Sequence, residues 1–160
     1  MTRLVSPFVL GLIAAASAFF VDQGTKVIVV ANAGPLRDSV PVFPGFNLVF
    51  FRNDGVTFGL LGGVPWWNLV ALALTICAWM MVLMLRTQNR IETLAYGLII
   101  GGALGNVLDR VRYGAVTDFI DLYVGSMHWP AFNLADALLV SGFAILLLLP
   151  ETKARRISAD

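Results

Sequence analysis

The sequence has very few of the side chains that form disulfides or bind transition metals. Its one cysteine, Cys77, lies in an apolar run, and its one histidine, His128, has no second histidine to share a metal. An intramolecular disulfide is therefore excluded, and zinc or iron chemistry is disfavoured. We expect no metal and no cofactor, and we expect His128 to be a loop residue.

Charged residues are scarce as well. Asp, Glu, Lys and Arg make up 13% of the 160 residues, hydrophobic residues make up 58%, and the formal net charge is +1. This balance offers no basic surface of the kind that nucleic acid requires, so we expect no nucleic-acid partner. The composition indicates an integral membrane protein rather than a soluble domain.

Four apolar segments are long enough to cross a membrane. A helix rising ~1.5 Å per residue needs roughly 20 residues to span a hydrocarbon core of ~30 Å. The segments are residues 7–31, 65–85, 91–108 and 132–149. We predict an α-helical integral membrane protein with four transmembrane helices, forming a single membrane-embedded domain over residues 1–160.

The first apolar segment also resembles a cleavable secretory signal. Arg3 precedes it, and small residues occupy positions 16–18. The apolar run continues to Val30, however, which makes it long enough to span the membrane. We therefore expect it to be retained.

Basic residues predict the orientation. Arg86 and Arg90 lie in a very short turn between the second and third spans, and both ends of the chain carry further basic residues. By the positive-inside rule, this turn and both termini face the cytoplasm. Five basic residues fall on the other side: Lys26, Arg37, Arg52, Arg110 and Arg112. Those five lie among acidic or polar residues, so the short turn carries more weight.

Two segments outside the spans have the composition of β-structure. In residues 38–63, prolines and glycines punctuate a β-prone run at residues 46–52, and residues 111–130 are partly β-branched and aromatic. We expect a small extracytoplasmic β-cradle lying on the membrane surface.

The third span carries glycines at intervals of four residues. Gly97, Gly101 and Gly105 form a small-xxx-small pattern, which lets a neighbouring backbone approach closely. We expect close helix packing along this face.

Ionisable residues within membrane spans are candidates for function by default. Asp22 and Lys26 are four residues apart on the first span, so they share one side and could pair, either as a structural ion pair or in contact with substrate. Asn106 and Arg110 repeat that spacing on the third span, with Asp109 beside them. The guanidinium of Arg110 could hold a carboxylate, although a structural anchor is the more conservative interpretation.

Two further aspartates fall at the same predicted membrane boundary. Asp118 follows the third span in what we expect to be an outer loop, and Asp136 opens the fourth helix on the same face as Asn133. Two carboxylates held close together cannot both ionise easily, so one keeps a proton while the other can activate water. Alternatively, Asp136 interacts with the helix dipole and Asp118 is a solvated loop charge.

Five short motifs recur in order along the chain. They are DQGTK at residues 22–26, RNDGVTFG at 52–59, GNVLDR at 105–110, VTDFI at 116–120 and FNLAD at 132–136. Together they resemble the motif set of prolipoprotein signal peptidase, the type II signal peptidase. The resemblance implies that Asp118 and Asp136 are the catalytic pair. It also implies that six residues line or support the site: Asp22, Lys26, Asn53, Asn106, Arg110 and Asn133.

The resemblance carries expectations about substrate. It implies an aspartyl endopeptidase that cuts a diacylglyceryl-modified prolipoprotein on the amino side of the lipidated cysteine, with membrane lipid as its other partner. Thr57 departs from the alanine expected in the second motif, which puts only the packing near Asn53 in doubt. We expect a monomer. The alternative is a non-enzymatic membrane protein, such as a transporter subunit or assembly factor, but the chain shows neither repeats nor a broken helix.

Overall fold

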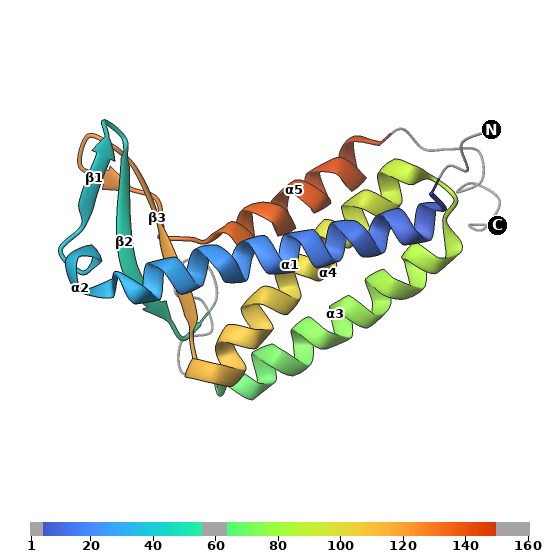
Figure 1. The fold of residues 1–160 in the computed structure, drawn as a ribbon, viewed down its shortest axis with the longest axis horizontal. Coiled ribbons are helices and arrows are strands. Elements are labelled where there is room, and N and C mark those ends of the chain that lie inside the picture. Colours follow the sequence, from blue (N-terminus) through green and yellow to red (C-terminus); the bar gives the residue numbers. More distant parts are fainter. Residues whose placement is uncertain (1–4, 56–63, 150–160) are drawn as a thin grey trace.

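The computed structural model describes residues 5–55 and 64–149. Its helices are α1 (Pro7–Ala31), α2 (Ala33–Leu36), α3 (Trp66–Arg86), α4 (Arg90–Tyr113) and α5 (Leu134–Leu148). Its strands are β1 (Val40–Phe43), β2 (Phe46–Asn53), β3 (Val116–Val124) and β4 (Met127–His128). The long helices lie side by side, and the sheet covers one end of the bundle (Figure 1). Thr57 and Arg3 lie outside the described residues.

Within residues 5–55 and 64–149, three helices are long and apolar enough to cross a membrane: α1, α3 and α4. The fourth, α5, is apolar but has 15 residues, so it rises only about 22 Å. It begins later than predicted because Asn133 caps it, and it ends before Leu149, whose backbone is extended. Pro150 follows in the sequence, and a residue before proline is disfavoured in a helix. The predicted fold class is confirmed, with these helix ends corrected.

The third predicted span continues further than its hydropathy suggested. We expected it to end at residue 108, but α4 extends to Tyr113 and stops at Gly114, whose φ of 70° is in the left-handed region that favours glycine at a helix C-terminus. The extra turn includes Asp109 and Arg110, and the chain then passes directly into β3. Helix α4 thereby connects the bundle to the sheet.

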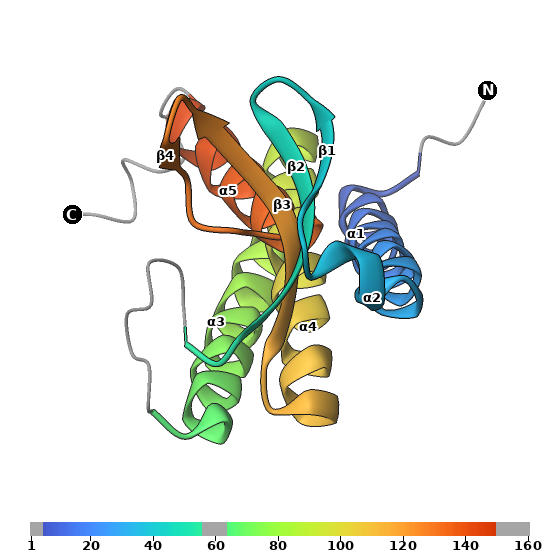
Figure 2. The ribbon, with the colours of Figure 1, turned by 90° about the vertical axis from the view of Figure 1, so that its left-hand side faces the viewer.

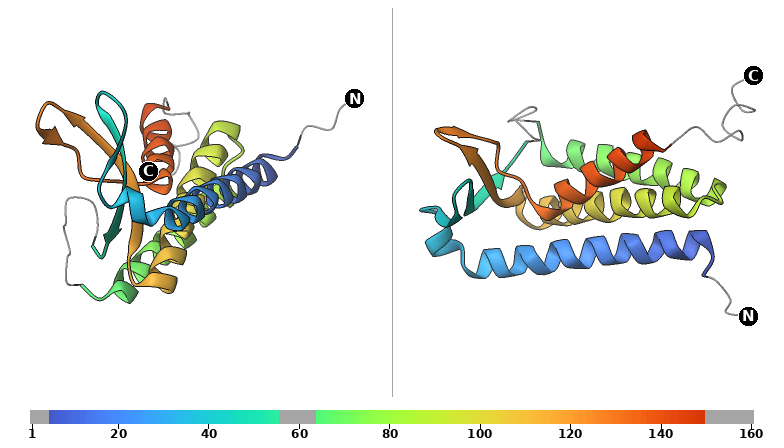
Figure 3. Two further views of the ribbon diagram at one scale, coloured as in Figure 1. Left: turned by 60° about the vertical axis from the view of Figure 1, so that its left-hand side comes forward. Right: turned by 90° about the horizontal axis from the view of Figure 1, so that it is seen from above.

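Helix α4 is the central helix and packs against α1, α3 and α5. The glycines at positions 97 and 101 allow α1 to approach, since a Cβ at either position would collide with the carbonyl oxygen of Gly11 or Ala15. The close packing predicted from the glycine spacing is confirmed. Seen from above, α1 lies along one side of the bundle (Figure 3), and Figure 1 shows it crossing α4 at an angle.

The four strands form one antiparallel sheet in the order β1-β2-β3-β4, as the sequence predicted for a small β-cradle. Figure 2 shows the sheet lying across the end of the helices. Asp118 pairs with Phe51 across the β2–β3 ladder, so it lies within the β-structure expected for residues 111–130 and not in an outer loop. His128 is also in a strand, the short β4, rather than in a loop.

Candidate active site

The two candidate catalytic aspartates line the same cavity, which has a volume of about 360 Å³. Asp118 comes from β3 and is 1% exposed, and Asp136 comes from the first turn of α5. Asn53, Asn106 and Arg110 line the cavity with them. The fold thus brings together side chains from β2, α4, β3 and α5 at the junction between sheet and bundle.

Side-chain amides hold both oxygens of Asp118. Asn53 donates from Nδ2 to Oδ2 over 2.9 Å, and Asn133 donates from Nδ2 to Oδ1 over 2.6 Å. Burial and then the nearby charge of Asp136 raise the pKa of Asp118 from 3.8 to about 6, although the two amides favour its ionised form. Asp118 is therefore a buried carboxyl that keeps its proton at a higher pH than an exposed one.

Asp136 is held from two directions. Asn106 donates from Nδ2 to its Oδ1 over 2.8 Å, and the backbone N–H of Asn133 donates to its Oδ2 over 3.2 Å. The side chain of Asn133 accepts in return from the backbone N–H of Asp136, which completes a capping box. Asn133 lies on the same side as Asp136, as predicted, but it is the N-cap and not a residue within the helix, and its position lets it contact both aspartates.

A buried ionic cluster lies behind the cavity. Lys26 pairs with Asp22 over 2.9 Å, and Asp109 lies 3.6 Å from the same ammonium. The three side chains are between 0% and 3% exposed. The pair predicted from the four-residue spacing is present, and its partners belong to the protein interior rather than to the cavity wall.

The contacts of Arg110 fit a structural anchor, the more conservative of the two interpretations of its sequence position. Its Nη2 donates to the backbone carbonyl of Gly55 over 2.7 Å, and its buried Nε has no hydrogen-bond partner among the described residues. The guanidinium lies close enough to Asp118 and Asp136 to interact electrostatically with both carboxylates. Arg110 therefore anchors the segment after β2 instead of forking onto a carboxylate.

The sequence did not assign a role to several polar residues near the site. Gln23 donates to the Asp22 carboxylate over 3.1 Å and to the carbonyl of Gly105 over 3.2 Å. The backbone N–H of Thr117 donates to Asp109 over 2.8 Å. Gln23 and Asp109 lie within the motifs at residues 22–26 and 105–110, so the motifs were the available signal.

A second polar group lies on the sheet, away from the cavity. His128 contacts Asp121 over 2.8 Å and stacks on Tyr123, and Asn47 donates to Asp121 over 2.8 Å. These contacts join β2, β3 and β4. We interpret the group as a fastening of the sheet.

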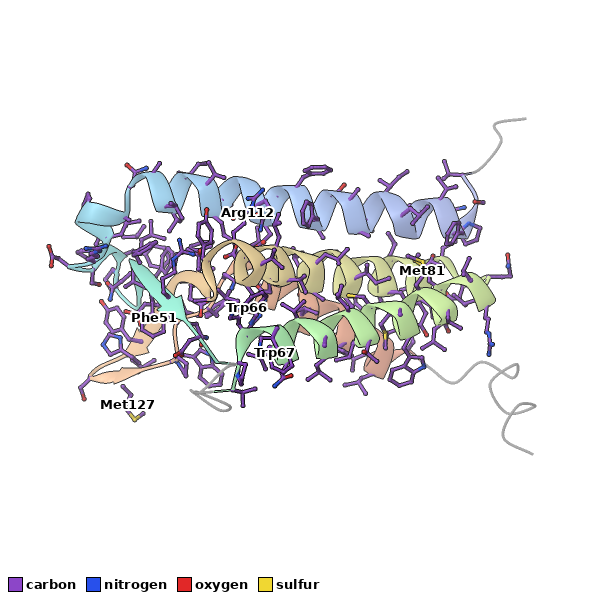
Figure 4. The ribbon with its side chains drawn as sticks, turned by 90° about the horizontal axis from the view of Figure 1, so that it is seen from below. Phe51, Trp66, Trp67, Met81, Arg112 and Met127 are labelled. Carbon is purple, nitrogen blue, oxygen red and sulfur yellow. The ribbon has the colours of Figure 1, made fainter. Side chains whose placement is uncertain are left out.

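Apolar side chains form most of the remaining cavity wall. They come from α3 and α5, with Ala103 from α4: Leu69, Leu72, Ala73, Ile76, Leu139, Val140 and Phe143. At the end of the bundle that carries the sheet, Phe51, Trp66 and Trp67 are exposed (Figure 4). Among residues 5–55 and 64–149, no three His, Cys, Asp or Glu side chains are placed to hold a metal ion.

Comparisons with known proteins agree on one family. A family model described as signal peptidase (SPase) II matches residues 14–150. The chain is 42% identical to the lipoprotein signal peptidase of Enterobacter sp. (strain 638) over 144 residues, which are 85% of this chain and 86% of that protein. It is 40% identical to the lipoprotein signal peptidase of Klebsiella pneumoniae (strain 342) over 147 residues, covering 87% and 88%.

Two solved structures share the fold. Both are described as bacterial membrane enzymes determined by the in meso method. One, at 2.3 Å resolution, has a TM-score of 0.79 and 30% identity, covering 86% of this chain and 85% of its own. The other, at 1.9 Å resolution, has a TM-score of 0.76 and 32% identity, covering 89% and 94%.

Proposed function

Because the chain belongs to the signal peptidase II family, we propose that it cleaves the signal peptides of lipidated prolipoproteins with Asp118 and Asp136 as an aspartyl catalytic pair. The observation that carries the proposal is that the two carboxylates line one cavity and that Asn133 hydrogen-bonds to both. The family assignment does not favour the alternative of a non-enzymatic transporter subunit or assembly factor.

The chemistry needs one proton between the two carboxyls. The ionised carboxylate removes a proton from a water molecule, whose oxygen attacks the carbonyl carbon of the scissile bond, while the protonated carboxyl donates to the carbonyl oxygen. Collapse of the tetrahedral intermediate breaks the C–N bond, and the new amine takes a proton from the pair. The raised pKa of Asp118 supports assigning the resting proton to that residue.

The cavity fits a substrate that is apolar on both sides of a polar bond. A signal helix and acyl chains can lie against the apolar walls from α3 and α5, while Asn53 and Arg110 face the polar backbone around the bond. A lipidated cysteine holds the scissile bond at the membrane interface, and the aspartates lie where the sheet meets the bundle. The expected product is a lipoprotein beginning with that cysteine.

The orientation of the chain in the membrane rests on the distribution of its basic residues. We propose that both termini and the turn between α3 and α4 lie in the cytoplasm, while the sheet lies on the outer surface of the bacterial inner membrane. The substrate is then presented from outside, where water reaches the aspartates. We propose that the enzyme acts as a monomer.

The proposal is tested with the purified full chain in detergent. A diacylglyceryl-modified precursor and its unmodified form are incubated with the protein, with and without EDTA, and the products are identified by mass spectrometry. We expect a cut on the amino side of the modified cysteine, little cutting of the unmodified form, and no effect of EDTA. Absence of cleavage, or activity lost to EDTA and restored by zinc, would overturn the proposed chemistry.

A further inference from the structure

The ammonium of Lys26 is surrounded by acceptors from two helices. It lies 2.9 Å from Asp22 Oδ2, 2.8 Å from Asn106 Oδ1 and 3.6 Å from Asp109 Oδ2. An ammonium has three N–H donors and no acceptor, and here it donates to Asp22 and Asn106 and forms a longer ion pair with Asp109. Lys26 is 3% exposed, and its charge is neutralised by protein groups rather than by solvent.

The first acceptor is connected to the start of α5. The other oxygen of Asp22, Oδ1, accepts from the backbone N–H of Ala135 over 3.0 Å, and Ala135 directly precedes Asp136. The approach of Asp22 to α4 requires Gly105, because a Cβ at that position would collide with the Asp22 carboxylate. Helix α1 thus fixes the backbone that carries Asp136.

Asp109, the acceptor in the longer ion pair, is connected to the start of β3. Asp109 Oδ2 accepts from the backbone N–H of Thr117 over 2.8 Å, and Thr117 directly precedes Asp118. Asp109 is 1% exposed, so this contact is shielded from water. The residue before each candidate catalytic aspartate is therefore bonded to a carboxylate that faces Lys26.

Asn106, the remaining acceptor, contacts the site itself. An asparagine amide has an acceptor oxygen at one end and a donor nitrogen at the other, so a partner at one end decides what the other end presents. Lys26 can only donate, and it therefore holds the oxygen of Asn106 toward α1. The nitrogen is left to donate to Asp136 over 2.8 Å.

We propose that Lys26 is the positioning residue for the catalytic pair, acting through Asp22, Asp109 and Asn106. It touches neither aspartate in its described contacts, but it connects the three groups that fix the backbone before each aspartate and the donor to Asp136. The inference rests on the proposed function, since it concerns how Asp118 and Asp136 are placed.

The test must separate positioning from folding. Replacing Lys26 alone would leave two buried carboxylates without their cation, which destabilises a protein strongly. The variant is therefore the pair Lys26→Met with Asp22→Asn, which removes one charge of each sign and keeps an oxygen to accept from Ala135. In a second variant, Lys26→Gln with Asp22→Asn, the glutamine is about as long as the methionine but supplies an N–H donor for Asn106.

Initial rates on a lipidated precursor give kcat and KM for each purified variant, and thermal unfolding in detergent reports folding. We expect the methionine pair to lower kcat about tenfold to a hundredfold with KM within about threefold, because the substrate walls are unchanged. The glutamine pair should recover kcat by about threefold or more over the methionine pair. Thr25→Val, on the same turn of α1, is the matched control and should keep the parent kcat.

Two results would overturn the proposal. One is a methionine pair with the parent kcat, and the other is a folded glutamine pair no more active than the methionine pair. If the methionine pair does not fold, the glutamine pair decides alone, and a kcat more than about a hundredfold below the parent refutes the role. Asp118→Asn and Asp136→Asn are measured beside them, since activity in those variants would instead remove the proposed function.

Discussion

Asn133 donates its side-chain amide to Asp118 over 2.6 Å while its backbone N–H donates to the carboxylate of Asp136. One residue thus contacts both members of the proposed pair, and it does so because it is the N-cap of α5 and not a residue within the helix. The N-cap of α5 therefore also determines how the two aspartates are held.

The first prediction concerns the pair itself. Asp118→Asn and Asp136→Asn should each abolish cleavage while the protein still folds and inserts into the membrane, because each removes half of a shared acid–base pair. The measurement is cleavage of a lipidated precursor by purified protein. Asp121→Asn is the matched control, since it makes the same change on the same strand at a carboxylate that contacts His128 and Asn47 instead. Turnover by either pair variant at the control rate would contradict the assignment.

The second prediction separates the two roles of Asn133. Serine can cap the helix but has no amide to reach Asp118, so Asn133→Ser should keep stability and lose about threefold to tenfold in rate, the effect of one hydrogen bond to a neutral carboxyl. Asn133→Ala should lose that rate and, in addition, about 1 kcal/mol of stability from the missing cap. Thermal unfolding and initial rates are measured for both variants. A serine variant with parent activity would show that the contact with Asp118 does not matter.

The sequence predicted the larger features because they depend on local pattern. Hydropathy located the four apolar helices, and a four-residue spacing was sufficient to pair Asp22 with Lys26. Proline and glycine around residues 46–52 identified the strand that became β2. These features need no knowledge of distant contacts.

The rest depends on contacts between segments that are far apart in the chain. Arg110 donates to the carbonyl of Gly55, 55 residues earlier, and no side-chain pattern marks a backbone carbonyl as a target. The role of Asn133 depended on a helix beginning one residue after it, a boundary that hydropathy does not define to that accuracy. Asp118 was predicted in a loop because its strand is stable only when paired with β2.

The third prediction follows from the raised pKa of Asp118, about 6 in the folded protein against 3.8 for an ordinary aspartate. Between these values the folded state binds a proton that the unfolded state has released, so the free energy of unfolding decreases as pH rises from about 4 to about 6. Asp118→Asn should remove this part of the pH dependence, and Asp38→Asn, at an exposed carboxylate, should not. Thermal unfolding in detergent across that window provides the measurement, and equal slopes in the parent and Asp118→Asn would refute the raised pKa.

The fourth prediction concerns residues that position the substrate. Asn53 and Arg110 line the cavity but do not supply the acid or base, so Asn53→Ala and Arg110→Ala should each retain measurable cleavage, about tenfold to a hundredfold below the parent. Arg110→Lys should recover only part of the loss, because an ammonium lacks the planar fork. Rates are normalised to folded protein. Variants as inactive as those at Asp118 and Asp136 would mean that these residues belong to the catalytic machinery.

The last prediction tests the orientation that the mechanism requires. Ser39 and Ser126 are exposed on the sheet side of the molecule, and Gln88 is exposed in the turn between α3 and α4. Cysteines at Ser39 and Ser126 should react with a membrane-impermeant thiol reagent in intact cells, whereas one at Gln88 should react only after the membrane is opened. The native Cys77 is buried, and labelling of the parent protein gives the background signal from this cysteine. Because a scissile bond at the outer interface can reach only aspartates on that side, the reverse labelling would place Asp118 and Asp136 in the cytoplasm and contradict both the orientation and the proposed route of the substrate.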